Sequence, residues 1–171
     1  MDESKTGAVA EAPVHVASMS SAVTWRSAMA FDATADAFGL PLDAAHEAGG
    51  EDHGPRPKTL VLTALCGCTA MDVVAILRKM RVSFEGFAVS AKAVLSDKHP
   101  KVFTQIALRY DFTGPALPLD KLERAVRLSL DSYCGVAAML RMTAAIDHAI
   151  YVNGVQPLAD HDATIRSAPA G

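Results

Sequence analysis

The sequence has few of the residues that mark a disulfide scaffold or a nucleic-acid-binding surface. Only three of its 171 residues are cysteine. This number is odd and too small for a disulfide framework in a chain of this length. Lys and Arg number 16 against 19 Asp and Glu; they are scattered and form no basic stripe for nucleic acid. We therefore expect no nucleic-acid partner, and a reducing, cytoplasmic environment in which the thiols stay free.

Signals for export, membrane insertion and metal binding are also missing. The N-terminal segment MDESKTGAVAEAP is acidic and has no continuous apolar stretch, which argues against a secretory signal. The apolar run from Leu60 to Leu77 is interrupted by Thr63, Thr69 and Asp72, so no membrane span is expected. None of the six histidines stands at ligand spacing from a cysteine, so no metal site and no cofactor are predicted.

The amino-acid composition indicates a folded protein with one hydrophobic core. Half of the residues are hydrophobic and a fifth are charged, and a chain of this length buries enough surface to fold as one domain. The two ends lack sustained periodicity. We predict an N-terminal tail at residues 1–20, a domain at residues 21–153 and a C-terminal tail at residues 154–171.

Alternation and turn residues predict the strands. The stretch at residues 22–33 is interpreted as a hairpin with Arg26 to Ala28 near its turn, and Phe38–Leu42 as an edge strand, since Pro41 cannot donate to a central ladder. Apolar residues alternate again at residues 87–95, 102–112 and 148–152.

Two long helices complete the prediction. The first begins at Pro57, a residue suited to the first helical position, and continues to Met80 as the central helix. The second follows a capping-box-like pair, Asp120 and Glu123, and runs to about Ile146. This order favours an α+β fold in which two long helices pack on an antiparallel sheet. The apolar surface to be covered makes a homodimer a reasonable expectation.

The cysteines are the most informative residues. Cys66 and Cys68 are two positions apart on the first helix and do not face each other. Cys66 shares its stripe with core residues, whereas Cys68 shares its own with Asp72, which is interpreted as a paired structural carboxylate. Cys134 lies on the predicted second helix, beside small residues.

Two interpretations of these thiols remain open at this point. If the helices pack together, Cys68 and Cys134 can form a bridge, and a thiolate can attack a peroxide oxygen and then condense with the second thiol. Alternatively, both behave as small buried hydrophobic residues, which is common for free cysteine.

Activation of Cys68 needs a cation from elsewhere in the chain. The residue lies about three turns inside its helix, where the macrodipole has little effect. An ionised and unpaired Asp72 one turn later would raise the pKa of the thiol. Arg26 and Arg56 are the candidate cations.

Three segments resemble a known family. GPRPKTLVLTALCGCTAMDVVAILRKMR, HPKVFTQIALRYDFTG and LERAVRLSLDSYCGVAAML are similar to the OsmC/Ohr proteins, named for osmotically induced protein C and organic hydroperoxide resistance. The similarity covers about residues 22–152 and is closest to the OsmC-like branch. It implies an OsmC-like fold, an intertwined α+β homodimer with two long central helices packed against sheets.

The resemblance also implies a reaction. The family's reactive cysteine matches Cys68 and its resolving cysteine matches Cys134, so the expected activity is a peroxiredoxin-like thiol peroxidase. Such an enzyme reduces organic hydroperoxides in oxidative-stress defence and is regenerated by a dithiol reductant.

Three departures from the family pattern keep other functions open. The hydroperoxide-reducing members place a glutamate directly after the helix-starting proline, where this chain has Lys58 after Pro57. Their thiolate-contacting arginine is not clearly reproduced, since Arg26 is only nearby, and Cys66 adds a third thiol. The alternatives are a non-enzymatic module that binds a small lipophilic ligand, and a thiol redox sensor.

Overall fold

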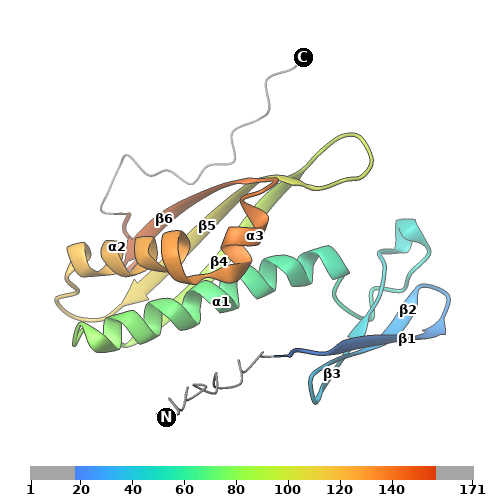
Figure 1. The fold of residues 1–171 in the computed structure, drawn as a ribbon, viewed down its shortest axis with the longest axis horizontal. Helices are drawn as coiled ribbons and strands as arrows, with labels where there is room; N and C mark the ends of the chain where they lie inside the picture. The colour runs from blue at the N-terminus through green and yellow to red at the C-terminus, as the bar shows by residue number, and fades with distance from the viewer. Residues whose placement is uncertain (1–17, 157–171) are drawn as a thin grey trace, which may run out of the picture. The chain divides into compact units, whose positions relative to one another are not determined.

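The computed structural model describes residues 18–156, so the predicted tails fall largely outside the described residues. The chain divides into two compact units between Arg56 and Pro57, and each is described by itself. The first unit contains β1 (Ser21–Ser27), β2 (Ala30–Ala35), β3 (Phe38–Leu42) and a 3-10 turn, η1 (His46–Ala48). The second contains α1 (Pro57–Lys79), β4 (Gly86–Leu95), β5 (Phe103–Thr113), α2 (Leu119–Leu128), the π turn η2 (Ser129–Tyr133), α3 (Gly135–Leu140) and β6 (Ala145–Val152) (Figure 1).

The first unit is a three-stranded antiparallel meander in the order β1-β2-β3. Its first hairpin turns at Ala28, whose φ of 44° is left-handed, which agrees with the predicted turn. The predicted edge strand is also confirmed, because among residues 18–156 β3 pairs with β2 alone and carries Pro41 at the edge of the sheet. Every residue of β1 is exposed in the described part of the chain, including the apolar Val23 and Trp25.

A buried carboxylate organises the loop after β3. Asp43 is 3% exposed and accepts backbone N–H groups from Ala44, Glu51 and His53 at 2.7, 3.0 and 3.2 Å. These hydrogen bonds, that of Glu51 above all, hold the pKa of Asp43 below its ordinary value against the opposing effect of burial. The loop is therefore a fixed structure.

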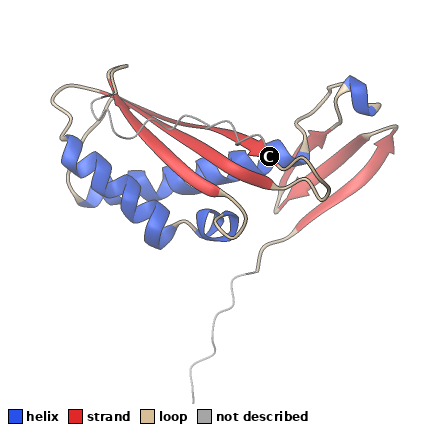
Figure 2. Cartoon of the chain, turned by 90° about the horizontal axis from the view of Figure 1, so that it is seen from above, coloured by secondary structure: helices blue, strands red, loops and turns tan. Residues whose placement is uncertain are grey.

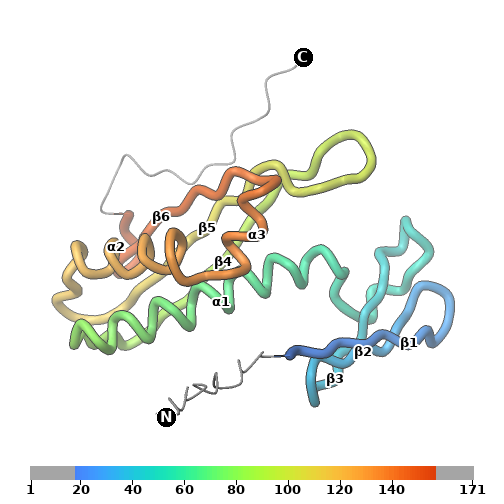
Figure 3. Tube along the Cα trace, viewed as in Figure 1, coloured from blue at the N-terminus to red at the C-terminus, as the bar shows by residue number. Residues whose placement is uncertain are grey.

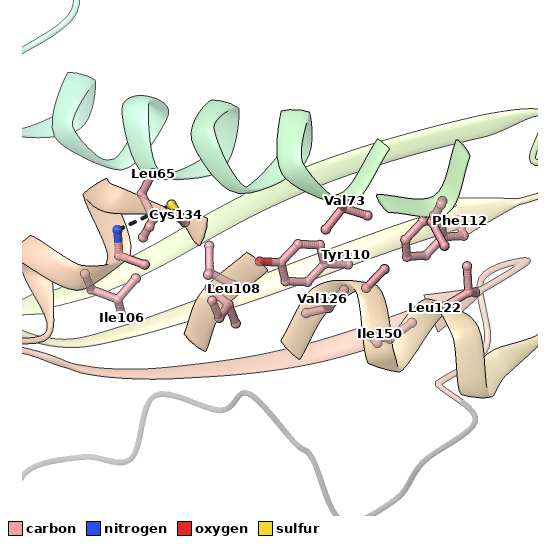
Figure 4. Packing of buried hydrophobic residues seen from close by; sticks show 14 of the residues in the cluster. Leu65, Val73, Ile106, Leu108, Tyr110, Phe112, Leu122, Val126, Cys134 and Ile150 are labelled. Carbon is pink, nitrogen blue, oxygen red and sulfur yellow. Dashed lines mark hydrogen bonds between the residues drawn. The ribbon is translucent and has the colours of Figure 1, made fainter. Parts of the chain in front are cut away.

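The central helix of the second unit buries one stripe of side chains. Leu65, Thr69, Val73 and Leu77 recur every four residues and are fully buried, because residues four apart share a helix face. Pro57 begins α1 as predicted. The buried stripe packs into a core with α2 and the second sheet, shown from close by in Figure 4.

Length and composition alone would allow α1 to cross a membrane. An 18-residue window of this helix has a mean hydropathy of 2.2, and 22% of the window is buried. Thr63, Thr69 and Asp72 therefore do not make the segment too polar for a membrane span, although they were expected to do so. Within the described residues one stripe of this helix packs into the core.

The second sheet has the order β4-β5-β6 and is mixed. β4 and β5 are antiparallel as predicted, with Val89 opposite Tyr110. β6 instead runs parallel to β5, with Ile150 beside Tyr110, so a wholly antiparallel sheet is wrong. The reason is the connection, since the helical segment between β5 and β6 returns the chain to the end of the sheet at which β5 began.

One face of this sheet carries the helices. In β5 the buried residues alternate, and they face α1 and α2, which lie together on that side (Figures 1 and 2). On the opposite face Arg109 pairs with Asp111 and lies over the ring of Tyr151 at 3.6 Å. The fold is α+β as predicted. The buried core is made of the following residues: Leu65, Val73, Leu77, Val82, Ile106, Leu108, Tyr110, Phe112, Leu122, Ala125, Val126, Leu130, Cys134, Ala137, Ala144 and Ile150.

The predicted second long helix is wrong in one important respect. Instead of one helix from Asp120 to Ile146, the chain forms α2, the π turn η2, an extended residue at Cys134 and the short α3. Figure 3 follows this broken path. Gly135 directly after Cys134 disfavours an uninterrupted helix, and the last strand begins at Ala145, three residues before its predicted start at His148.

The predicted capping box at the start of this segment is also not formed. The N-cap of α2 is Pro118, without a side-chain cap hydrogen bond, and Asp120 lies inside the first turn. There its negative charge still interacts favourably with the helix dipole.

Candidate thiol site

Cys68 lies in the middle of α1, half-buried, next to the fully buried Thr69. Uninterrupted helix geometry over Pro57–Lys79 sets its direction. Cys66, two residues earlier, lies on a different face of the helix. It is half-buried and packs against the core, as Cys68 also does, so burial does not set the two cysteines apart. Burial raises the pKa of the Cys66 thiol.

Cys134 lies at the break between the π turn and α3. Its backbone is extended, with φ −73° and ψ 100°, and its N–H donates to the carbonyl of Ser129 at 2.8 Å. Its sulfur accepts the backbone N–H of Ala137 at 3.4 Å, which caps α3. Figure 4 shows this sulfur beside Leu65 of α1, with the hydrogen bond dashed. The break therefore turns Cys134 toward α1.

The structure brings the two predicted site cysteines together. The Sγ atoms of Cys68 and Cys134 and a carboxylate oxygen of Asp72 all lie within 4.8 Å of one another. Both cysteines are free thiols. Since a disulfide requires sulfurs about 2.05 Å apart, a modest movement of either side chain separates this state from a bridge.

Asp72 is held in place by a chain of buried hydroxyl groups. Ser129 donates to the Asp72 carboxylate at 3.0 Å and lies 2.9 Å from the hydroxyl of Thr69, which in turn lies 2.8 Å from the hydroxyl of Tyr110. Ser129, Thr69 and Tyr110 are all fully buried. Asp72 is thus a paired carboxylate, as interpreted, but its partner is a hydroxyl group and it lies at the thiols.

Sequence reasoning did not identify Ser129, Thr69 or Tyr110. The available signal was Thr69, a polar residue at a position of the stripe otherwise filled by Leu65, Val73 and Leu77. A buried hydroxyl requires a hydrogen-bond partner, and that requirement points to a second polar group on a facing element.

The surroundings of Cys134 disfavour its thiolate form. Burial, the Cys68 thiol and the Asp72 carboxylate raise the pKa of Cys134 to about 11, although the N–H of Ala137 opposes this shift. Burial also raises the pKa of Tyr110. At neutral pH, Cys134 is therefore a protonated thiol and Tyr110 a neutral hydroxyl.

The two candidate cations have carboxylate partners in the first unit. Arg26 pairs with Asp32 across the β1–β2 hairpin, and Arg56 pairs with Asp52. Lys58, in the first turn of α1, is exposed. The activation of Cys68 by either arginine stays a prediction.

Two surface pockets lie along α2, apart from the thiols. One, of about 390 Å³, is lined mostly by charged and polar residues. A smaller one, of about 130 Å³, includes Arg141 and His148. Neither lining includes Cys68 or Cys134, and such walls suit an ionic ligand better than an apolar one. The larger pocket is lined by Asp120, Glu123, Arg124, Arg127, Leu128, Asp131 and Ser132.

Comparison with solved structures supports the fold. A hypothetical protein from Aquifex aeolicus VF5 superposes with a TM-score of 0.72 at 24% identity, covering 81% of this chain and 98% of that protein. An organic hydroperoxide resistance protein OsmC from Legionella pneumophila superposes with a TM-score of 0.65 at 17% identity, covering 81% of this chain and all of that protein. At these identities the likeness establishes the fold.

Comparison of sequences establishes the family. Protein YhfA of Escherichia coli K12 is 39% identical over 101 residues, which are 59% of this chain and 75% of the relative. The family model described as OsmC-like protein matches residues 49–149, which include all three cysteines and Asp72. The chain belongs to the OsmC-like protein family.

Proposed function

We propose that this protein reduces organic hydroperoxides as part of oxidative-stress defence, with Cys68 as the peroxidatic and Cys134 as the resolving cysteine. The observation that supports this proposal best is the approach of the two sulfurs to within 4.8 Å from separate elements, α1 and the α2–α3 break. A solved protein of the same fold carries the name organic hydroperoxide resistance protein.

The reaction proceeds in three steps. The Cys68 thiolate attacks the terminal peroxide oxygen, the O–O bond breaks, and Cys68 becomes a sulfenic acid, while the alkoxide takes up the proton that the Cys68 thiol released and leaves as the alcohol. The Cys134 sulfur then attacks the Cys68 sulfur, water leaves, and a disulfide forms. A dithiol reductant exchanges with that disulfide, restores both thiols and is itself oxidised to a disulfide.

The order of the two cysteines follows from their surroundings. Cys134 is 3% exposed and its pKa is raised to about 11, so it is shielded and protonated when a hydroperoxide arrives. Cys68 is more exposed. Because the thiolate is the attacking species and needs access to the substrate, Cys68 is the better peroxidatic residue.

We further propose that the working form is a cytoplasmic homodimer. α1 is apolar on most of its circumference but buries one stripe, and Val61 and Met71 on the rest are 39% and 74% exposed. The wholly exposed β1 presents a second uncovered surface. A second copy of this chain would cover such surfaces, and the free thiols suit a reducing compartment.

Turnover of an alkyl hydroperoxide tests the enzymatic proposal. The reduced protein and a dithiol are mixed with the hydroperoxide, and its consumption is followed by stopped flow. Cys68→Ser is expected to abolish turnover and Cys134→Ser to stop it after the sulfenic acid forms, whereas Cys66→Ser serves as the matched control and retains activity. Absence of consumption by the wild-type protein, or unchanged consumption by Cys68→Ser, would overturn the proposal.

One observation favours a second function, the binding of a small lipophilic ligand. Lys58 stands where the hydroperoxide-reducing proteins of the resemblance have a glutamate. The two pockets along α2 have charged linings and are not the place for such a ligand. Native mass spectrometry of the protein isolated from cells distinguishes the two, because a retained apolar ligand together with inert thiols would favour binding.

A further inference from the structure

The group formed by Cys68, Asp72 and Cys134 has the donor chemistry of a metal site. One sulfur, one carboxylate oxygen and a second sulfur, all within 4.8 Å of one another, are ligand atoms that Zn²⁺ accepts. In a tetrahedral site with Zn–S bonds of about 2.3 Å, two sulfurs lie roughly 3.8 Å apart. The three donor atoms therefore lie close to the spacing that one ion requires.

Two of the donors are placed by regular helix geometry. Cys68 and Asp72 are four residues apart on α1, so their side chains project from the same face one turn apart. The third comes from the helix break, where the extended backbone of Cys134 directs its sulfur toward α1. Cys66 is not one of the three members of this group, and two positions from Cys68 it lies on another face of α1.

The carboxylate also has the support that metal ligands require. The Ser129 hydroxyl donates to Asp72 at 3.0 Å, and Thr69 and Tyr110 continue the chain into the core. Hydrogen bonds of this kind orient a ligand and maintain its position before the ion arrives. The Asp72 carboxylate is thus positioned in advance by hydroxyl groups that are not themselves ligands in this site.

We propose that Cys68, Asp72 and Cys134 form a site for a thiophilic divalent cation of the Zn²⁺ class. Two sulfurs favour such an ion over Mg²⁺ or Ca²⁺, which prefer oxygen ligands. Three protein ligands leave a fourth tetrahedral position for water. Binding releases the thiol protons, and thiolates held by the ion are not available to a hydroperoxide, so metal binding and the proposed peroxide reaction exclude each other.

Cobalt and zinc titrations of the fully reduced protein, without peroxide, test this site. Co²⁺ bound by thiolates gives a sulfur-to-cobalt charge-transfer band, and Zn²⁺ added afterwards displaces it. Cys68→Ser, Cys134→Ser and Asp72→Asn are each expected to weaken Zn²⁺ binding by more than about tenfold, since even the loss of a group that supports a ligand costs this much. Cys66→Ser is the matched control and retains the wild-type affinity.

A measurement on the wild-type chain guards against variants that do not fold. Bound Zn²⁺ is expected to protect Cys68 and Cys134 from alkylation and to leave Cys66 unprotected. No charge-transfer band, equal protection of all three thiols, or Cys66→Ser as the only weakened variant would overturn the proposal. The metal site does not rest on the peroxidase function. If the protein binds zinc but does not turn over hydroperoxide, the metal site is supported and only the peroxidase function is contradicted.

Discussion

The hydroxyl of Ser129, the first residue of the π turn, donates a hydrogen bond of 3.0 Å to the carboxylate of Asp72 on α1. The same hydroxyl lies 2.9 Å from Thr69. This contact joins the central helix to the irregular segment that carries Cys134, and it lies beside both thiols. The distance between the two sulfurs is therefore linked to the integrity of a buried polar network.

Ser129→Ala is expected to destabilise the protein by about 1–3 kcal/mol. The substitution removes a buried hydroxyl and leaves Asp72 and Thr69 without that hydrogen-bond partner, which carries the cost of unsatisfied buried polar groups. Urea denaturation measures the change in the free energy of unfolding. Ser132→Ala, an exposed position in the same π turn, is the control, and equal stability of the two variants would contradict the role given to Ser129.

Asp72→Asn is expected to lower the pKa of Cys134 from about 11, because the negative charge of Asp72 is one of the causes that raise it. Burial remains, so the pKa stays above the ordinary thiol value of 9.0. The alkylation rate of Cys134 against pH, resolved by peptide mass spectrometry, gives the pKa. Asp147→Asn, at an exposed position of β6, should leave the profile unchanged, and an upward shift in Asp72→Asn would refute this account.

Asp43 is expected to make the protein sensitive to acid. Its pKa is lower in the folded chain than the ordinary value of 3.8, so its contribution is complete above that value. The contribution is lost as the pH falls through the lower folded-state pKa. Asp43→Asn lacks this ionisation and should show a smaller loss of stability between neutral pH and pH 3.8 or below, measured by urea denaturation. If the free energies of unfolding of the wild-type protein and Asp43→Asn fell equally with pH, the role given to Asp43 would be contradicted.

Gly50 is expected to tolerate no side chain. A Cβ at this position would lie 2.1 Å from the carbonyl oxygen of Ala44, so Gly50→Ala must displace the backbone of the loop that Asp43 organises. Thermal unfolding should show a loss of stability of about 1–3 kcal/mol, as for overpacking elsewhere. Gly67→Ala is the matched control, since nothing lies within 4 Å of a Cβ in the chain and alanine favours a helix by about 0.5–1 kcal/mol. A Gly50→Ala variant as stable as the wild-type protein would show that the loop is not tightly packed.

The regular elements were predictable because their signals are local. Pro57 and the apolar residues after it define α1, and alternation defines the faces of β4 and β5. Alternation does not specify the direction of a neighbouring strand, so the parallel pairing of β6 with β5 was missed. The break at Cys134 was missed because apolar residues at helical spacing continue on both sides of it, in α2 and α3, and Gly135 alone does not locate a break.

The site was predictable in part for the same reason. Cys68 and Cys134 stand in recognisable segments, and the structure brings them together. The partner of Asp72 is 57 positions away in the sequence, and no periodic pattern connects residues over that distance. The hydroxyl network is a product of how α1 packs on η2 and β5, which only the folded chain reveals.

The most direct test of the account is the identity of the disulfide formed by a hydroperoxide. The reduced protein is treated with one equivalent of an alkyl hydroperoxide, and its peptides are mapped under non-reducing conditions. The account predicts a bridge between Cys68 and Cys134, with Cys66 left as a free thiol. A product in which both of these cysteines remain reduced, or in which Cys66 forms the bridge, would contradict it.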